Sequence, residues 1–81
     1  MLIRVKLFAS YREMVGRDQV EIEIAPGGTV GDALDALGRR HPVLAEQAYA
    51  PLAACNLTHV GLAHPLREGD ELAIFPPVSG G

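Results

Sequence analysis

The chain has 81 residues, of which 48% are hydrophobic and 21% are charged, with a formal net charge of −3 at pH 7. This length and composition predict one folded domain with a single small core. The negative charge argues against nucleic acid as the main partner, and the lack of a long apolar run argues against a membrane span or a signal peptide. A single cysteine excludes an internal disulfide framework, so we expect a cytoplasmic protein.

Two segments near the N-terminus alternate apolar and polar side chains with the period of a β-strand. They cover residues 2–8 and residues 19–25, and we expect them to pair in antiparallel fashion. A short helix is predicted between them, over residues 11–15, from a capping-box spacing and a closing glycine. The residues that signal this helix are Ser10, Glu13 and Gly16.

A longer helix is predicted over residues 30–40, after the turn Pro26-Gly27-Gly28. Thr29 is a good N-cap, and Asp32 occupies the third helical position, where a carboxylate favours the helix N-terminus. Pro42 is expected to stop the helix. One apolar stripe at helical spacing is formed by Val30, Ala33, Leu34 and Leu37.

The second half of the chain contains shorter elements. Residues 43–51 are ambiguous, although Ala45 to Ala50 could make another helical turn. A buried strand is predicted over residues 52–57, a short edge strand near residues 59–62, a turn over 66–71 and a closing strand over 72–75 that Pro76 ends. Strands around one main helix indicate an α+β domain, with the first and last strands central and side by side. This order predicts a β-grasp, the ubiquitin-like fold, with a mixed sheet of four to five strands.

The interior of the sequence offers no convincing active site. Cys55 lies in an apolar run and is interpreted as a small buried hydrophobic residue. The three histidines have no metal-ligand spacing, so neither a metal nor a cofactor is expected. The acidic pairs and the Gly27-Gly28 turn are interpreted as a solvated surface and a simple turn. The acidic pairs are Glu21 with Glu23 and Asp32 with Asp35, and the histidines are His41, His59 and His64.

The C-terminal segment is the most informative part of the sequence. Two glycines at positions 80 and 81 make a slim peptide that can enter a narrow channel, and Pro76-Pro77 favours an extended conformation before them. Residues 76–81 span at most about 20 Å when extended. We therefore expect a globular domain over residues 1–75 and an extended tail over residues 76–81, in which the Gly81 carboxylate is the best candidate reactive group.

Several motifs resemble the small subunit of molybdopterin synthase, the MoaD family. The resemblance spans nearly the whole chain, and its C-terminal part is the most specific. The similar segments are Val5-Lys6-Leu7-Phe8-Ala9 with Arg12-Glu13, Leu52-Ala53-Ala54-Cys55-Asn56, His64-Pro65-Leu66, Arg67-Glu68-Gly69-Asp70-Glu71-Leu72 and Phe75-Pro76-Pro77-Val78-Ser79-Gly80-Gly81.

This resemblance implies a sulfur carrier that is itself not catalytic. The family's terminal glycine is adenylated by an ATP-dependent activating enzyme, receives sulfur from a desulfurase or rhodanese type of donor and becomes a thiocarboxylate. It then donates sulfur to cyclic pyranopterin monophosphate inside the large synthase subunit, in an assembly of two large and two small subunits. Carried over, Gly81 bears the sulfur, Gly80 gives slim access, Pro76, Pro77, Val78 and Ser79 thread the partner, and Phe75 with the neighbouring apolar face anchors it.

Three alternatives stay open from the sequence. The chain could carry sulfur to another acceptor, such as thiazole, tRNA or a sulfur amino acid. It could be a protein modifier joined to lysines, in which case self-conjugation has only Lys6 as a side-chain acceptor. It could also be a simple binding module whose Gly-Gly ending is coincidental.

Overall fold

The computed structural model describes residues 1–47 and 50–77. Ala48, Tyr49 and residues 78–81 lie outside the described part, and so does the middle of the helical turn considered for residues 45–50. The helices of the described part are α1 (Ser10–Val15), α2 (Val30–Arg40) and α3 (Pro42–Ala45). Its strands are β1 (Leu2–Leu7), β2 (Gln19–Glu23), β3 (Leu52–Cys55), β4 (Thr58–Val60) and β5 (Glu71–Phe75).

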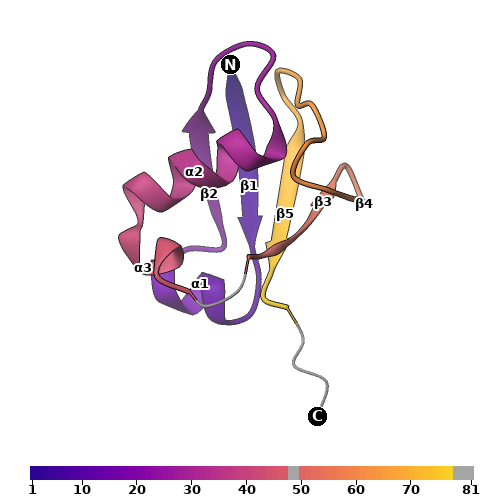
Figure 1. Cartoon of the computed structure of the whole chain (residues 1–81). Helices are drawn as coiled ribbons and strands as arrows, with labels where there is room; N and C mark the ends of the chain where they lie inside the picture. Colours follow the sequence, from indigo (N-terminus) through magenta and orange to yellow (C-terminus); the bar gives the residue numbers. More distant parts are fainter. Residues whose placement is uncertain (48–49, 78–81) are drawn as a thin grey trace.

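The strands of the described residues form one mixed sheet in the order β2-β1-β5-β3-β4. β1 and β5 are parallel neighbours at its centre, and the other pairings are antiparallel. Helix α2 covers one face of this sheet. Because β1 and β5 are parallel, their C-terminal ends lie at the same end of the sheet (Figure 1). The predicted β-grasp and the central position of the first and last strands are confirmed.

Strand alternation and the helix stripe meet in the core. Every second residue of β1 faces α2, and the same is true of β5. The two central strands therefore place pairs of side chains next to each other in the core. The fully buried residues of largest volume are Ile3, Val5, Leu7, Ile22, Val30, Leu37, Leu72 and Ile74. In residues 1–47 and 50–77, no helix has the length and apolar character needed to span a membrane.

The predicted N-cap of α2 is confirmed, and the predicted N-cap of α1 is wrong. The Thr29 side chain accepts a hydrogen bond from the Asp32 amide, and the Asp32 carboxylate accepts one from the Thr29 amide at 2.9 Å. Helix α1 instead begins at Ser10 itself, behind Ala9, which has no acceptor side chain and a φ of 52°. The expected Ser10–Glu13 capping box therefore does not form, although Gly16 closes α1 in the left-handed conformation as predicted.

Two further expectations in the second half need correction. Pro42 does more than end α2, because it occupies the first turn of the short helix α3, where a missing N–H is tolerated. The strand predicted over residues 52–57 ends at Cys55, since Asn56 and Leu57 both have positive φ, 47° and 74°, and form the connection to β4. Leu57 is consequently not buried but 95% exposed.

Candidate functional site

One face of the sheet is left open by the helices. The side chains that alternate away from the core on β1, β5, β3 and β4 lie in rows across this face, because the strand registers place them side by side. One row contains Lys6, Ala73, Ala54 and His59. We call this surface the open face; it runs from a charged end near the start of β5 to an aromatic end where β5 stops.

The aromatic end consists of Phe8, Leu52, His59 and Phe75. The rings of Phe8 and Phe75 stack, with centroids 4.7 Å apart and planes inclined by 15°. The His59 ring lies 6.5 Å from that of Phe75 at an angle of 49°, and Leu52 pairs with Phe75 across the sheet. Because Phe8 and Leu52 keep 39% and 47% of their surface exposed, this end presents apolar area to a partner.

Phe75 is the last residue of β5 and thus joins the aromatic end to the C-terminal segment. The stack with Phe8 fixes the point at which the chain leaves the sheet, since β1 and β5 are hydrogen-bonded neighbours. Pro76 and Pro77 follow Phe75 outside any strand and are partly buried. Of the residues expected to thread a partner and carry the sulfur, Val78, Ser79, Gly80 and Gly81 lie outside the described residues.

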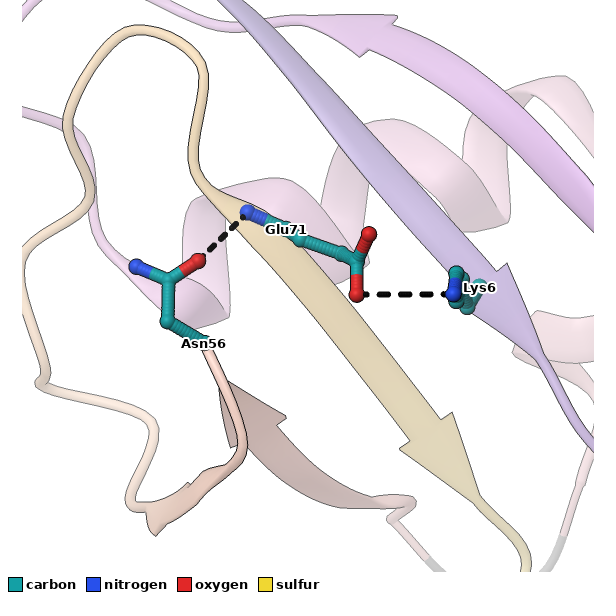
Figure 2. A network of polar contacts seen from close by, with 3 residues as sticks. All are labelled: Lys6, Asn56 and Glu71. Carbon is teal, nitrogen blue, oxygen red and sulfur yellow. Dashed lines mark hydrogen bonds and ion pairs between the residues drawn. The ribbon is translucent and has the colours of Figure 1, made fainter.

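The charged end contains one ion pair. Lys6 Nζ lies 3.6 Å from Glu71 Oε1, across the two central strands, and both side chains are partly exposed (Figure 2). Arg4 pairs with Glu71 along the same register. An ion pair this exposed contributes little to stability, so its importance lies in the charges that it shows to a partner.

Asn56 holds the beginning of β5 from the neighbouring hairpin. Its Oδ1 accepts a hydrogen bond from the Glu71 amide at 3.1 Å (Figure 2). Its Nδ2 donates one to Asp70 Oδ1 at 3.1 Å. The Asn56 amide also donates to the Glu71 carbonyl oxygen. These contacts fix the register of β5 and thereby the position of Phe75 at the other end of the strand.

Asp70 and Cys55 lie beside this contact. The hydrogen bond from the Arg67 amide, more than those from Asn56 and Cys55, lowers the pKa of Asp70 despite its partial burial. Burial and the nearby Asp70 carboxylate raise the pKa of the Cys55 thiol, which disfavours the nucleophilic thiolate. The prediction that Cys55 is a small buried residue is confirmed.

The histidines do not come together in the described residues. In that part of the chain, no group of three or more His, Cys, Asp or Glu side chains is arranged to hold a metal ion. His59 instead lies beside Phe75 on the open face. Sequence reasoning singled out Phe75 but missed Phe8 and His59 as its neighbours. Extending the alternation of β1 by one residue places Phe8 on the open face. The position of His59 beside Phe75 depends on the register of the β3–β4 hairpin, which the sequence does not show.

These features define a class of protein: a ubiquitin-like β-grasp domain whose open sheet face leads, through an aromatic end, into the C-terminal segment. The ThiS family profile matches residues 5–81, so the chain belongs to the ThiS family. The resemblance to molybdopterin synthase small subunits that the motifs indicated is confirmed by the relatives of this chain.

The relatives carry two kinds of name. Small archaeal modifier protein 1 of Haloferax volcanii is 43% identical over 84 residues, covering 94% of this chain and 97% of the relative. The molybdopterin synthase sulfur carrier subunit of Escherichia coli is 42% identical over 87 residues, covering 99% of this chain and 100% of the relative. Both kinds of relative match almost the whole chain.

Solved structures give the same fold. The crystal structure of SAMP1 from Haloferax volcanii has a TM-score of 0.89 at 37% identity and covers 100% of both chains. A chain of the Amycolatopsis orientalis BexX/CysO complex has a TM-score of 0.74 at 26% identity, covering 98% of this chain and 99% of that one. The similar structures therefore include one that was solved as a complex with another protein.

Proposed function

We propose that this chain is the sulfur-carrier subunit of a molybdopterin synthase. In this proposal residues 1–75 form the domain that partners recognise, and residues 76–81 form the arm that carries sulfur. Gly81 bears the sulfur as a thiocarboxylate and donates it to cyclic pyranopterin monophosphate. The observation that carries the proposal is the stacked Phe8–Phe75 pair, which joins an exposed apolar surface directly to the segment ending in Gly80-Gly81.

The chemistry requires activation of the Gly81 carboxylate. An ATP-dependent activating enzyme joins the carboxylate to AMP as a mixed anhydride and releases pyrophosphate. The persulfide of a desulfurase or rhodanese type of donor then attacks the carbonyl carbon, and AMP leaves with the electron pair of the broken C–O bond. Reductive cleavage of the resulting S–S bond by a thiol frees the thiocarboxylate. The reacting groups other than Gly81 belong to the partners.

Docking on the open face would position the arm in each partner. Aromatic side chains near the centre of an interface contribute a large share of binding energy, and Phe75 is partly exposed and stacked on the exposed Phe8. Two glycines let the end of the chain pass a channel too narrow for side chains. The large synthase subunit and the activating enzyme would then bind the same surface in turn.

Intact-protein mass spectrometry tests the first half of the proposal. The chain is incubated with ATP, an activating enzyme from the same organism and a persulfide donor, and we expect one oxygen to be replaced by one sulfur at Gly81. A chain without Gly81, or with a residue added after it, should keep its folded circular dichroism spectrum and acquire no sulfur. Sulfur on either control chain, or none on the unaltered chain with a competent enzyme, would refute the proposal.

The second half concerns the acceptor. Charged carrier is mixed with the large subunit and cyclic pyranopterin monophosphate, and dithiolene formation is followed by chromatography of the pterin. A second candidate function is that of a protein modifier, which the 43% identity to small archaeal modifier protein 1 favours. Amide-linked conjugates without sulfuration of the pterin would support the modifier. Sulfur transfer to thiazole or tRNA alone would support a carrier for another pathway.

A further inference from the structure

Strand β2 forms one edge of the sheet, and within residues 1–47 and 50–77 no strand pairs with its outer side (Figure 1). Its inner side is paired with β1, next to which the Leu7 amide donates to the Asp18 carbonyl oxygen at 2.9 Å. In an antiparallel pair, residues that exchange hydrogen bonds alternate with residues whose backbone groups point away from the partner. The amide and carbonyl groups of Gln19, Glu21 and Glu23 therefore point outward from the sheet.

The contact of Arg40 with β2 agrees with this orientation. Arg40 is the last residue of α2, and its Nη1 donates a hydrogen bond of 2.8 Å to the outward carbonyl oxygen of Glu21. A long charged side chain laid on an edge strand hinders pairing with another chain. Because the Arg40 side chain is exposed, this single hydrogen bond can be exchanged for another one at small cost.

A hollow of about 360 Å³ lies beside this edge, and we call it the basic hollow. It is lined by Arg17, Gln19, Val20, Glu21, Arg40 and His41. The carboxylate among these residues belongs to Glu21, whose side chain alternates with the buried Val20 and so points to the open face, where Glu21 pairs with Arg4. The two arginines therefore make the helix side of the edge positive, whereas Glu21 and Glu23 make its open-face side negative.

We propose that the outer side of β2 is a strand-addition site for an extended segment of a partner protein, in which acidic side chains alternate with neutral or basic ones. The backbone of this segment pairs with the outward groups of Gln19, Glu21 and Glu23. Its acidic side chains enter the basic hollow beside Arg17 and Arg40, and the alternate side chains lie near the Glu21 carboxylate. Arg40 then exchanges the Glu21 carbonyl oxygen for a carboxylate of the segment.

The charges of the edge favour such a segment over a second copy of this chain. If two copies paired in antiparallel fashion with β2 at the centre of the register, the two Glu21 side chains would face each other. Like charges directly opposite one another on paired strands are destabilising. The other edge of the sheet, β4, has only the three residues Thr58–Val60 and offers few backbone groups to a partner.

A segment bound at β2 leaves the aromatic end accessible. It lies three strand spacings from β5, which is about 14 Å. One partner can therefore be held at β2 while another docks near Phe75. The inference does not depend on the proposed function, since it uses neither the aromatic end nor the C-terminal segment.

An NMR titration of the ¹⁵N-labelled full chain tests the proposal. The probe is a seven-residue peptide with blocked ends in which glutamate alternates with threonine, and the matched control has glutamine in place of glutamate. We expect the glutamate peptide to shift the amide signals of Gln19, Glu21 and Glu23 and to slow their hydrogen exchange, without effect on Thr58–Val60. The glutamine peptide should bind at least about tenfold more weakly.

Three results of this titration would overturn the proposal. Equal affinity for the two peptides would exclude the basic hollow as the source of selectivity. Shifts of the arginine side-chain signals without slower exchange at β2 would show anion binding without strand addition. No binding of the glutamate peptide at millimolar concentration would exclude the site altogether.

Variants separate the contribution of charge from that of backbone pairing. Arg17→Gln should weaken binding of the glutamate peptide by at least about threefold, whereas Arg67→Gln, which removes a cation from the turn before β5, should not. Glu21→Pro removes one outward amide without changing the pairing with β1, and Glu21→Gln controls for the lost charge. We expect binding to be lost only in Glu21→Pro.

Circular dichroism checks that each variant is folded. Equal binding by Glu21→Pro and Glu21→Gln would refute the pairing of backbones, and unchanged binding by Arg17→Gln would refute the role of the basic hollow. If Glu21→Pro does not fold, the exchange rates of the β2 amides in the unaltered protein decide whether the backbones pair.

Discussion

Replacing Leu57 by glycine should stabilise the protein. Leu57 has a φ of 74° in the two-residue connection between β3 and β4, a position where turns with two left-handed residues favour glycine. The left-handed conformation costs a non-glycine residue about 1–2 kcal/mol, and the greater freedom of glycine in the unfolded chain offsets about 0.5–1 kcal/mol of that. Because Leu57 is 95% exposed, removal of its side chain loses almost no buried area. The expected net gain is about 0.5–1 kcal/mol.

Thermal unfolding followed by circular dichroism measures this gain. For a domain of this size, we expect the Tm of Leu57→Gly to rise by about 2–8 °C. The matched control is Leu57→Ala, which removes the same exposed side chain but keeps the Cβ and hence the backbone strain, so its Tm should stay near that of the unaltered protein. Equal rises in both variants would show that the exposed leucine, and not the backbone, was unfavourable. An unchanged Tm in Leu57→Gly would refute the reasoning.

Two further predictions concern the contact between the hairpin and β5. Asn56→Ala should lower the free energy of unfolding by about 2–4 kcal/mol in urea titrations, since it removes two side-chain hydrogen bonds and puts alanine at a φ of 47°. Asn56→Gly should be less harmful than Asn56→Ala because glycine tolerates that φ, and the reverse order would contradict this explanation. The lowered pKa of Asp70 stabilises the folded state above the ordinary carboxyl pKa of about 4, and this stabilisation is lost as the pH falls through the lower folded-state pKa. Urea titrations from pH 7 to pH 3 should therefore show a smaller loss of stability for Asp70→Asn than for the unaltered protein, and parallel losses would exclude Asp70 as a source of acid sensitivity.

The regular elements could be predicted from the sequence because local signals and tertiary structure agree there. Residues 3–7 alternate strictly between apolar and basic side chains, and the Thr29–Asp32 cap precedes a complete apolar stripe. The predicted bounds of strand β1 and helix α2 therefore agree almost to the residue with those of the structure. The central position of β5 followed from its apolar character. The C-terminal motif was specific enough to indicate the family that the comparisons support.

The errors arose where a local signal competed with the tertiary structure. Ser10 has a side chain typical of an N-cap, but in the structure it is the first residue of α1, and Ala9 occupies the N-cap position. Phe8, directly before Ala9, is stacked on Phe75. The apolar side chain of Leu57 favours a buried strand, whereas Asn56 and Leu57 both adopt positive φ and form a turn. The aromatic end required the pairing register of four strands, which composition and periodicity do not provide.

The position of β5 at the centre of the sheet also determines when the protein can fold. Until Glu71–Phe75 has been synthesised, β1 with β2 and β3 with β4 are separate hairpins, and nothing joins them into one sheet. Long-range pairing of this kind makes folding slow and dependent on contacts between distant parts of the chain. A nascent chain still lacking these residues therefore cannot bury Leu72 and Ile74 against α2, and remains open to chaperones and proteases. A chain that ends before Glu71 therefore lacks the strand that joins its two hairpins into one sheet.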